Sequence, residues 1–248
     1  MRTTILSIGV LLFLASPVRA QTADEIIAKY IKAIGGRDKI DAIKTLRKTG
    51  KFIGGGGFEA PMVEMNKRPD KVREEFSLQG LTGITAYDGK TGWKIQPWGG
   101  KKDPEPLSDE ELKGTVQSAD MDGPLVDYRQ KGHTVEYLGM EPVEGTDSYK
   151  LKVTLKDGDI RYYYFDTDYY VPIKIESKQI VRGTEVESET SLGDYKEVDG
   201  VYMPFSFESG AKGSQFTSKV TYGTMETNVP MADSLFTEPA VSPVPPSK

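Results

Sequence analysis

The stretch Tyr149-Lys150-Leu151-Lys152-Val153-Thr154-Leu155 decides the fold class of this chain. Apolar side chains alternate in it with lysines and a threonine, which is the two-residue period of a strand that buries one face. Asp157-Gly158 then supplies a tight turn, and Ile160 to Phe165 returns as a second strand. The sequence therefore predicts an antiparallel hairpin with one face in a core.

Similar segments flank this hairpin on both sides and make the protein mainly β. Candidate strands lie at 46–53, 71–79, 81–87, 93–98 and 133–140 before it, and at 171–177, 185–198, 201–208 and 215–225 after it. In a further candidate, 58–66, Pro61 reduces part of the segment to an edge strand or a bulge. We expect about ten or eleven strands with meander-like turns, because no strand–helix alternation of the parallel kind is present.

A few helices accompany these strands. Thr22 to Glu25 forms a capping box, and Gly35-Gly36 ends the helix that follows, whose apolar stripe is Ile26, Ile27, Tyr30, Ile31 and Ile34. A short second helix is expected at about Asp38 to Ile43. Ser108 to Glu111 is a second capping box, which opens a helix with the modest stripe Leu112, Val116 and Ala119.

The N-terminus indicates export. Arg2, the apolar run Ile5 to Ala15 and the small residues around Val18-Arg19-Ala20 have the layout of a cleaved signal peptide, which we place at residues 1–20. A single domain is expected at 21–238, and a disordered tail at 239–248, which is rich in Pro and Ser. Export without any cysteine favours the bacterial periplasm over a disulfide-rich secreted protein.

Charge and composition exclude some partners. The net charge of −5 is made of mixed signs, so nucleic acid is not an expected partner. No stretch after the signal peptide is long and apolar enough for an integral membrane segment. We expect a monomer.

Residues with catalytic or metal-binding chemistry are scarce. His133 is the single histidine, and neither a nucleophile elbow nor a cysteine accompanies it, which argues against a catalytic triad and a zinc site. Asp120 to Gly123 and Asp166 to Asp168 resemble fragments of calcium loops without the remaining ligands, so turns are the better interpretation. We predict no catalytic residue, metal or cofactor, and therefore no enzyme.

Apolar and aromatic side chains remain as candidates for ligand binding. Alternation and aromatic content single out six residues as the lining of an apolar cavity: Phe52, Phe76, Leu78, Trp93, Ile95 and Trp98. Plain core packing is the alternative interpretation of the same residues. A curled sheet capped by helices has room for a ligand such as an acyl chain.

Several segments, taken in order, resemble a known family. They are Ala23 to Ile27 with Ile34-Gly35-Gly36, Ala42 to Leu46, Tyr87 to Trp93, Asp122 to Tyr128, and Asp194-Tyr195 with Asp199-Gly200-Val201 and Pro204-Phe205. Together they resemble the outer-membrane lipoprotein-sorting proteins, relatives of the periplasmic carrier LolA and its receptor LolB. The resemblance implies an unclosed antiparallel β-barrel of about eleven strands, with helices as a lid over an apolar cavity.

The same resemblance implies a function. It is that of a periplasmic carrier for lipoprotein acyl chains or another apolar ligand in cell-envelope biogenesis, with an envelope protein as a possible delivery partner. The family's lid-latching arginine has only Arg47 and Arg73 as strand-borne candidates here, and the receptor's anchoring cysteine is absent. Two alternatives stay open, namely an interaction or scaffold module with a solid core, and a hydrolase with an unrecognised carboxylate site.

Overall fold

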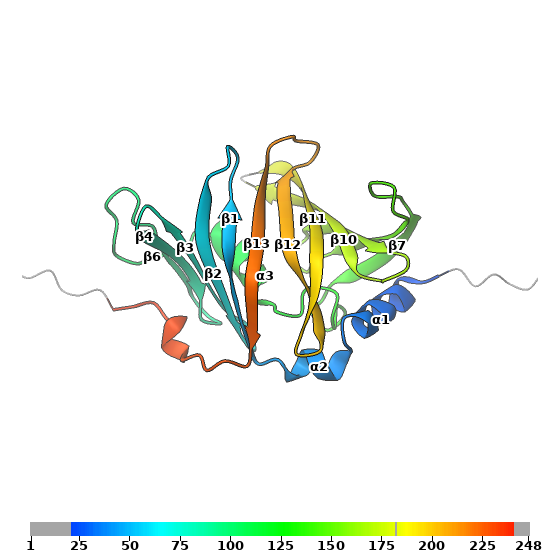
Figure 1. Ribbon diagram of the computed structural model, residues 1–248, viewed down its shortest axis with the longest axis horizontal. Helices are drawn as coiled ribbons and strands as arrows, with labels where there is room; N and C mark the ends of the chain where they lie inside the picture. Colours follow the sequence, from blue (N-terminus) through cyan, green and yellow to red (C-terminus); the bar gives the residue numbers. More distant parts are fainter. Residues whose placement is uncertain (1–20, 182, 241–248) are drawn as a thin grey trace, which may run out of the picture.

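Two strand meanders share one antiparallel sheet in the computed structural model, which describes residues 21–181 and 183–240. Consecutive strands are neighbours throughout each meander, and β1 pairs with β13 to join them, in the order β6-β5-β4-β3-β2-β1-β13-β12-β11-β10-β9-β8-β7. β6 and β7 are the two edges of the sheet, which therefore stays unclosed (Figure 1). The predicted unclosed antiparallel fold is confirmed, with 13 strands in place of about eleven. The predicted signal peptide and residues 241–248 of the predicted tail lie outside the described residues.

The elements begin and end close to the predicted turns. The helices are α1 (Ala23–Ala33), α2 (Arg37–Ala42), α3 (Asp109–Ala119) and the 3₁₀ turn η1 (Asp233–Leu235). The first meander contains β1 (Thr45–Ile53), β2 (Glu59–Lys67), β3 (Lys71–Leu78), β4 (Leu81–Tyr87), β5 (Gly92–Ile95) and β6 (Glu105–Pro106). The second contains β7 (Thr134–Met140), β8 (Ser148–Thr154), β9 (Ile160–Asp166), β10 (Pro172–Val181), β11 (Thr184–Val198), β12 (Val201–Ala211) and β13 (Thr217–Thr227).

The expectation for Pro61 is confirmed for the part of the strand that contains it. β2 lies between β1 and β3 in the sheet, but only Met62 to Lys67 pair with β3. Glu59 to Pro61 pair with β1 alone, and Pro61 is opposite Lys51 in regular register. The exposed Pro61 therefore lies where the strand has a neighbour on one side only, which suits a residue without a backbone N–H.

The register identifies one face of the sheet, which we call the inner face. Directly opposed residues share a face. The inner face therefore runs from β8 to β3 through Leu151, Tyr163, Ile175, Thr190, Ser209, Phe207, Val220, Phe52, Met62 and Phe76. Ile26 and Ile27 of α1 pack on this face against Leu151 and Phe165. Both predicted capping boxes are present, at α1 and α3.

Helix α3 lies behind the central strands in Figure 1 and contacts two walls of the curled sheet. On the first wall, Asn66 Nδ2 of β2 donates to the Ser118 carbonyl oxygen at 3.0 Å. On the second, Lys113 Nζ lies 2.6 Å from Asp159 Oδ1 at the β8–β9 turn. Ala119 is fully buried, whereas Val116 of the predicted apolar stripe is largely exposed. Polar contacts therefore hold α3 as much as apolar packing does.

The opposite, outer face of β2 to β5 is covered by the chain after β13. Met231 and Phe236 pack there against Met65 of β2. The indole Nε1 of Trp93 donates to the Phe236 carbonyl oxygen at 2.7 Å, and Arg73 Nη1 donates to that of Leu235 at 2.9 Å. This C-terminal segment is thus packed against the outer face and forms part of the fold.

Replacing Phe236 by alanine should lower the free energy of unfolding by about 3 kcal/mol, because its ring is fully buried. The C-terminal segment should then loosen, and Trp93 should become accessible to acrylamide quenching in a Trp98→Phe background. Phe216→Ala is the matched control, since that ring is 86% exposed and its loss should change stability by less than about 0.5 kcal/mol. Equal stability of the two variants would contradict this account.

Candidate functional site

The inner face encloses an apolar cavity between α2 and the middle strands. Its volume is about 180 Å³. Aliphatic and thioether side chains dominate the lining, which includes Ile34, Ile40, Ile43, Leu46, Met121, Val201, Met203, Phe207 and Met225. A methionine thioether adapts its shape readily, so this lining can accommodate a ligand of variable outline.

Two further spaces adjoin this cavity. A second cavity of about 140 Å³ shares Tyr30, Ile34, Asp122, Tyr202 and Pro204 with the first. A more open groove of about 590 Å³ lies between α3 and the β8–β9 turn and shares Pro124 with the second cavity. Residues 120–126, which we call the plug segment, contribute to the walls of all three spaces. The plug segment therefore divides what would otherwise be a larger interior.

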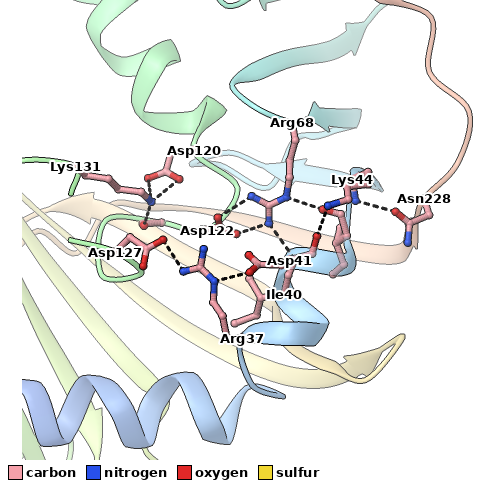
Figure 2. Close-up of polar contacts among 12 residues, drawn as sticks. Arg37, Ile40, Asp41, Lys44, Arg68, Asp120, Asp122, Asp127, Lys131 and Asn228 are labelled. Atoms are coloured by element: carbon pink, nitrogen blue, oxygen red, sulfur yellow. Dashed lines mark hydrogen bonds and ion pairs between the residues drawn. The ribbon is translucent and has the colours of Figure 1, made fainter. Parts of the chain in front are cut away.

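An arginine holds the plug segment against α2. Arg68 lies in the β2–β3 turn, and its Nη1 and Nη2 bind the two carboxylate oxygens of Asp122 at 2.7 and 2.5 Å (Figure 2). The same guanidinium donates to the carbonyl oxygens of Ile40 at 3.0 Å and Ile43 at 2.7 Å. The hydrogen bonds that Arg68 donates to Asp122 are the largest cause of a raised pKa of Arg68, so the group stays charged. One planar side chain thus joins α2, the plug segment and a sheet turn.

More exposed ion pairs surround this arginine. Lys131 Nζ binds Asp120 at 2.6 Å and the Gly123 carbonyl oxygen at 2.7 Å, while Arg37 reaches Asp41 and Asp127, both at 2.7 Å (Figure 2). The Arg37 and Asp41 side chains are each at least two-fifths exposed. Exposed pairs of this kind contribute little stability, so Arg68 and Asp122 form the main fastening of the plug segment.

The pair of Arg68 and Asp122, which we call the latch, was not predicted from the sequence. Arg47 and Arg73, the strand-borne candidates, lie on the outer face. Both are directly opposite Met65 of β2, which lies on that face, in the register of the neighbouring strands. Arg73 binds Glu75 and the Leu235 carbonyl oxygen there. The signal that could have identified Arg68 is its position before Pro69, because an Arg-Pro step between two strands places a long cation in a turn at the sheet end.

Four of the six predicted cavity residues lie on the inner face, but nearer the opposite end of the sheet from α2. Phe52 contacts Phe76, and Phe76 contacts Trp98, with ring centroids 5.7 and 5.8 Å apart. Phe58 extends this aromatic row, at 5.7 Å from Phe52. Leu78 shares the strand and the face of Phe76. These residues line none of the three spaces described above, and a role for them in ligand binding stays a prediction.

The other two predicted residues, Trp93 and Ile95, are not on the inner face. The register pairs Trp93 with Ala86 and Ile95 with Ile84, on the outer face. Trp93 is only 1% exposed because the C-terminal segment covers it. The two residues are therefore removed from the predicted cavity lining.

A polar row crosses the inner face between the aromatic row and the cavity. Lys48 Nζ binds Glu64 Oε1 at 2.7 Å, and the Tyr222 hydroxyl donates to Glu64 Oε2 at 2.7 Å. Burial opposes ionisation of Glu64, but Lys48 and these hydrogen bonds outweigh it, so its pKa is lowered. Glu74, directly opposite Glu64 on β3, has its pKa raised to about 7 by burial and by the Glu64 charge.

His133 and the acidic side chains carry the metal-binding and acid–base chemistry of this chain. Within residues 21–181 and 183–240, no three His, Cys, Asp or Glu side chains gather as metal ligands. His133 Nδ1 accepts a hydrogen bond from the Lys156 backbone N–H at 3.0 Å, and burial, followed by the Lys131 charge, lowers its pKa. His133 also contributes to the wall of the groove beside α3.

Comparison with known proteins identifies the fold. No family model and no curated protein matches the chain. Among solved structures, a LolA superfamily protein from Nitrosomonas europaea is 16% identical, with a TM-score of 0.59 over 88% of this chain and 98% of that one. The chain has a LolA-like fold.

Two other structures agree with this assignment. An outer membrane lipoprotein-sorting protein domain from Vibrio parahaemolyticus is 14% identical, with a TM-score of 0.59 over 86% of this chain and 94% of that one. A DUF1329 family protein from Desulfovibrio piger is 12% identical, with a TM-score of 0.61 over 86% of this chain and 96% of that one. At these identities the LolA-like architecture is shared, and the resemblance noted in the sequence is confirmed at the level of fold.

Arg68→Ala should lower the free energy of unfolding by about 3 kcal/mol, because it leaves the Asp122 carboxylate partly buried without its partner. Arg37→Ala is the matched control and should cost less than about 1 kcal/mol, since its pairs are exposed. Urea unfolding of Arg68→Ala, Asp122→Ala and Arg68→Ala/Asp122→Ala measures the coupling between the two side chains. Additive effects of the two substitutions would show that the latch does not exist in solution.

Glu74→Gln should remove a pH dependence of stability. The folded-state pKa of Glu74, about 7, lies above its usual value near 4.5, so the unfolded chain ionises first and the protein loses stability as the pH rises from about 4.5 to 7. The loss should amount to about 3 kcal/mol and should be absent in Glu74→Gln. Thr85→Val, which changes a cross-strand neighbour but no carboxyl group, should keep the wild-type slope. Parallel slopes for all three proteins would contradict the assignment.

Proposed function

We propose that this protein carries a lipid or lipoprotein acyl chain in the space between its inner face and the plug segment, without catalysing a reaction on it. The observation that carries the proposal is an apolar interior roofed by a segment that an ion-pair latch fastens. An ion pair contributes little net stability, and water can replace its contacts, so a roof fastened by Arg68 and Asp122 can open at a lower cost than one held by apolar packing.

The dimensions of the interior support a carrier that opens. The two enclosed cavities, about 180 and 140 Å³, are each below the usual size of a ligand pocket. Displacement of the plug segment would join them with each other and with the groove of about 590 Å³ beside α3. Each methylene buried in that space would contribute about 0.8 kcal/mol, so a chain of ten carbons could compensate for the loss of the latch.

The setting follows from the leader-like N-terminus. We propose that residues 1–20 are a cleaved signal peptide, that residues 21–238 act as one domain in the periplasm, and that cargo is handed to a partner in the cell envelope. Two of the similar structures are named for lipoprotein sorting or the LolA superfamily, which supports this direction. No helix among the described residues is long and apolar enough to cross a bilayer.

A scaffold function without cargo is the second candidate. The small size of the enclosed cavities favours it, because most of the inner face below the aromatic row is filled by side chains of α1, α2 and the plug segment. Under this alternative the inner face would never open, and the protein would act through its surface.

Native mass spectrometry of protein purified from its own periplasm should detect a lipid or acylated peptide at about one per chain. A fluorescent fatty-acid probe should displace it and bind the delipidated protein. Met203→Trp should weaken probe binding at least about tenfold, because the larger side chain fills the first cavity. Arg68→Ala should speed probe release, because the plug segment opens more often.

Leu138→Trp, which adds the same ring at an exposed site on β7, is the control and should bind the probe like the wild type. Circular dichroism of both tryptophan variants separates lost binding from lost folding. A wild-type protein that is empty and binds no probe would favour the scaffold function.

A further inference from the structure

Exposed apolar side chains are concentrated at one end of the sheet. This end, which we call the rim, consists of the turns that follow β1, β3, β5, β10 and β12. Six large apolar side chains there are exposed to solvent: Phe58, Leu81, Trp98, Ile180, Val186 and Phe216. Phe216 is 86% exposed, the highest value among the large apolar residues of the described chain. Exposure of so many apolar side chains to water is unfavourable, and such a surface usually marks the site where a partner or a membrane covers them.

The register shows that these turns share one end. Ile53 pairs with Lys219, Gly210 with Thr217 and Val181 with Thr184, so the β1–β2, β12–β13 and β10–β11 turns lie beyond the same ends of paired strands. Figure 1 shows the first two of these turns side by side at the upper limit of the molecule. α1 and α2 lie at the opposite end. The rim is thus the mouth of the curled sheet away from the latch.

Phe58 and Phe216 lie on two separate turns that contain glycines. Phe58 follows the run Gly54 to Gly57, in which Gly56 and Gly57 have positive φ, and Phe216 follows Gly213, also at positive φ. Rings carried on individual turn tips can enter a soft surface independently, whereas a protein partner usually covers one continuous patch.

The charge of the rim differs from that of the whole chain. The five turns, 54–58, 79–80, 96–104, 182–183 and 212–216, contain four basic residues, Lys101, Lys102, Arg182 and Lys212, and one acidic residue, Asp103. Their charges sum to +3, whereas the whole chain has a net charge of −5. Lys101 and Lys212 also pair with Glu105 and Glu176 beside the turns. A basic set of turns on an acidic protein is complementary to anionic lipid headgroups.

The rim is also continuous with the inner face. Phe58 contacts Phe52, Phe52 contacts Phe76 and Phe76 contacts Trp98, so the aromatic row leads from the turn tips into the curled sheet. An apolar chain that leaves a bilayer at the rim would meet aromatic side chains rather than water along this path.

We propose that the rim docks on an anionic lipid bilayer, with the rings of Phe58, Trp98 and Phe216 in the interfacial layer and Lys101 and Lys102 facing the headgroups. This inference does not rest on the proposed carrier function, because a scaffold protein could dock in the same way. Bilayer binding and probe binding are measured separately, so either can fail alone.

The test is cosedimentation of the full mature protein with vesicles of phosphatidylethanolamine and phosphatidylglycerol at low and moderate salt. The wild type should bind, and should bind vesicles of phosphatidylcholine alone at least about tenfold more weakly. Phe58→Ser/Phe216→Ser should weaken binding at least about tenfold, and Lys101→Glu/Lys102→Glu should do the same at low salt. In a Trp93→Phe background, the emission of Trp98 should shift to the blue on vesicle addition.

Tyr169→Ser is the matched control, since Tyr169 is 74% exposed in the β9–β10 turn at the other end of the sheet. It should bind vesicles like the wild type. The side chains changed in the rim variants and in the control are exposed, so these variants should fold like the protein that carries them, and circular dichroism checks the folding of the Trp93→Phe background. The proposal is overturned if the wild type does not bind, if the rim variants bind equally well, or if sedimentation velocity shows that the rim rings instead join two copies of the chain.

Discussion

The pairing of β1 with β13 is the contact on which the arrangement of this molecule depends. Each meander, β1 to β6 and β7 to β13, places neighbouring strands side by side without help from the other. Only the β1–β13 ladder makes them one sheet with a common inner face. The latch follows from it, because Arg68 belongs to the first meander and Asp122 to the link between the two. The cavity also depends on the β1–β13 ladder, because Leu46 of β1 and Met225 of β13 both line it.

Different physical forces act at the two ends of the inner face. Near α2, aliphatic side chains and one charged latch enclose small cavities. Toward the rim, aromatic rings contact one another in a row along the inner face. The polar row of Lys48, Glu64 and Tyr222 separates these regions. Because the sheet is not closed, its edge strands β6 and β7 can move apart without breaking backbone hydrogen bonds between strands.

Local pattern explains which parts of this structure were predictable. Capping boxes and alternation depend on neighbours in sequence, so α1, α3 and the β8–β9 hairpin were predicted close to their observed positions. The alternation of residues predicts that Trp93 and Ile95 share a face of the sheet, but it does not identify that face. Trp93 is buried on the outer face by the C-terminal segment, which follows it by more than a hundred residues. The Arg68–Asp122 pair spans 54 residues and has no local signature. The cavity lies between α2 and β12, which meet only in the folded chain.

The position of β13 at the centre of the sheet governs when the protein can fold. β1 leaves one side without a neighbour until residues 217–227 have been added, so the central ladder forms only after both meanders have been made. Contacts between such distant segments are slow to form. The first meander can pair its own strands early, but β1 keeps an open backbone edge until β13 arrives. An open strand edge invites pairing with other chains, so the newly made protein is most prone to aggregation in the interval before β13 is in place.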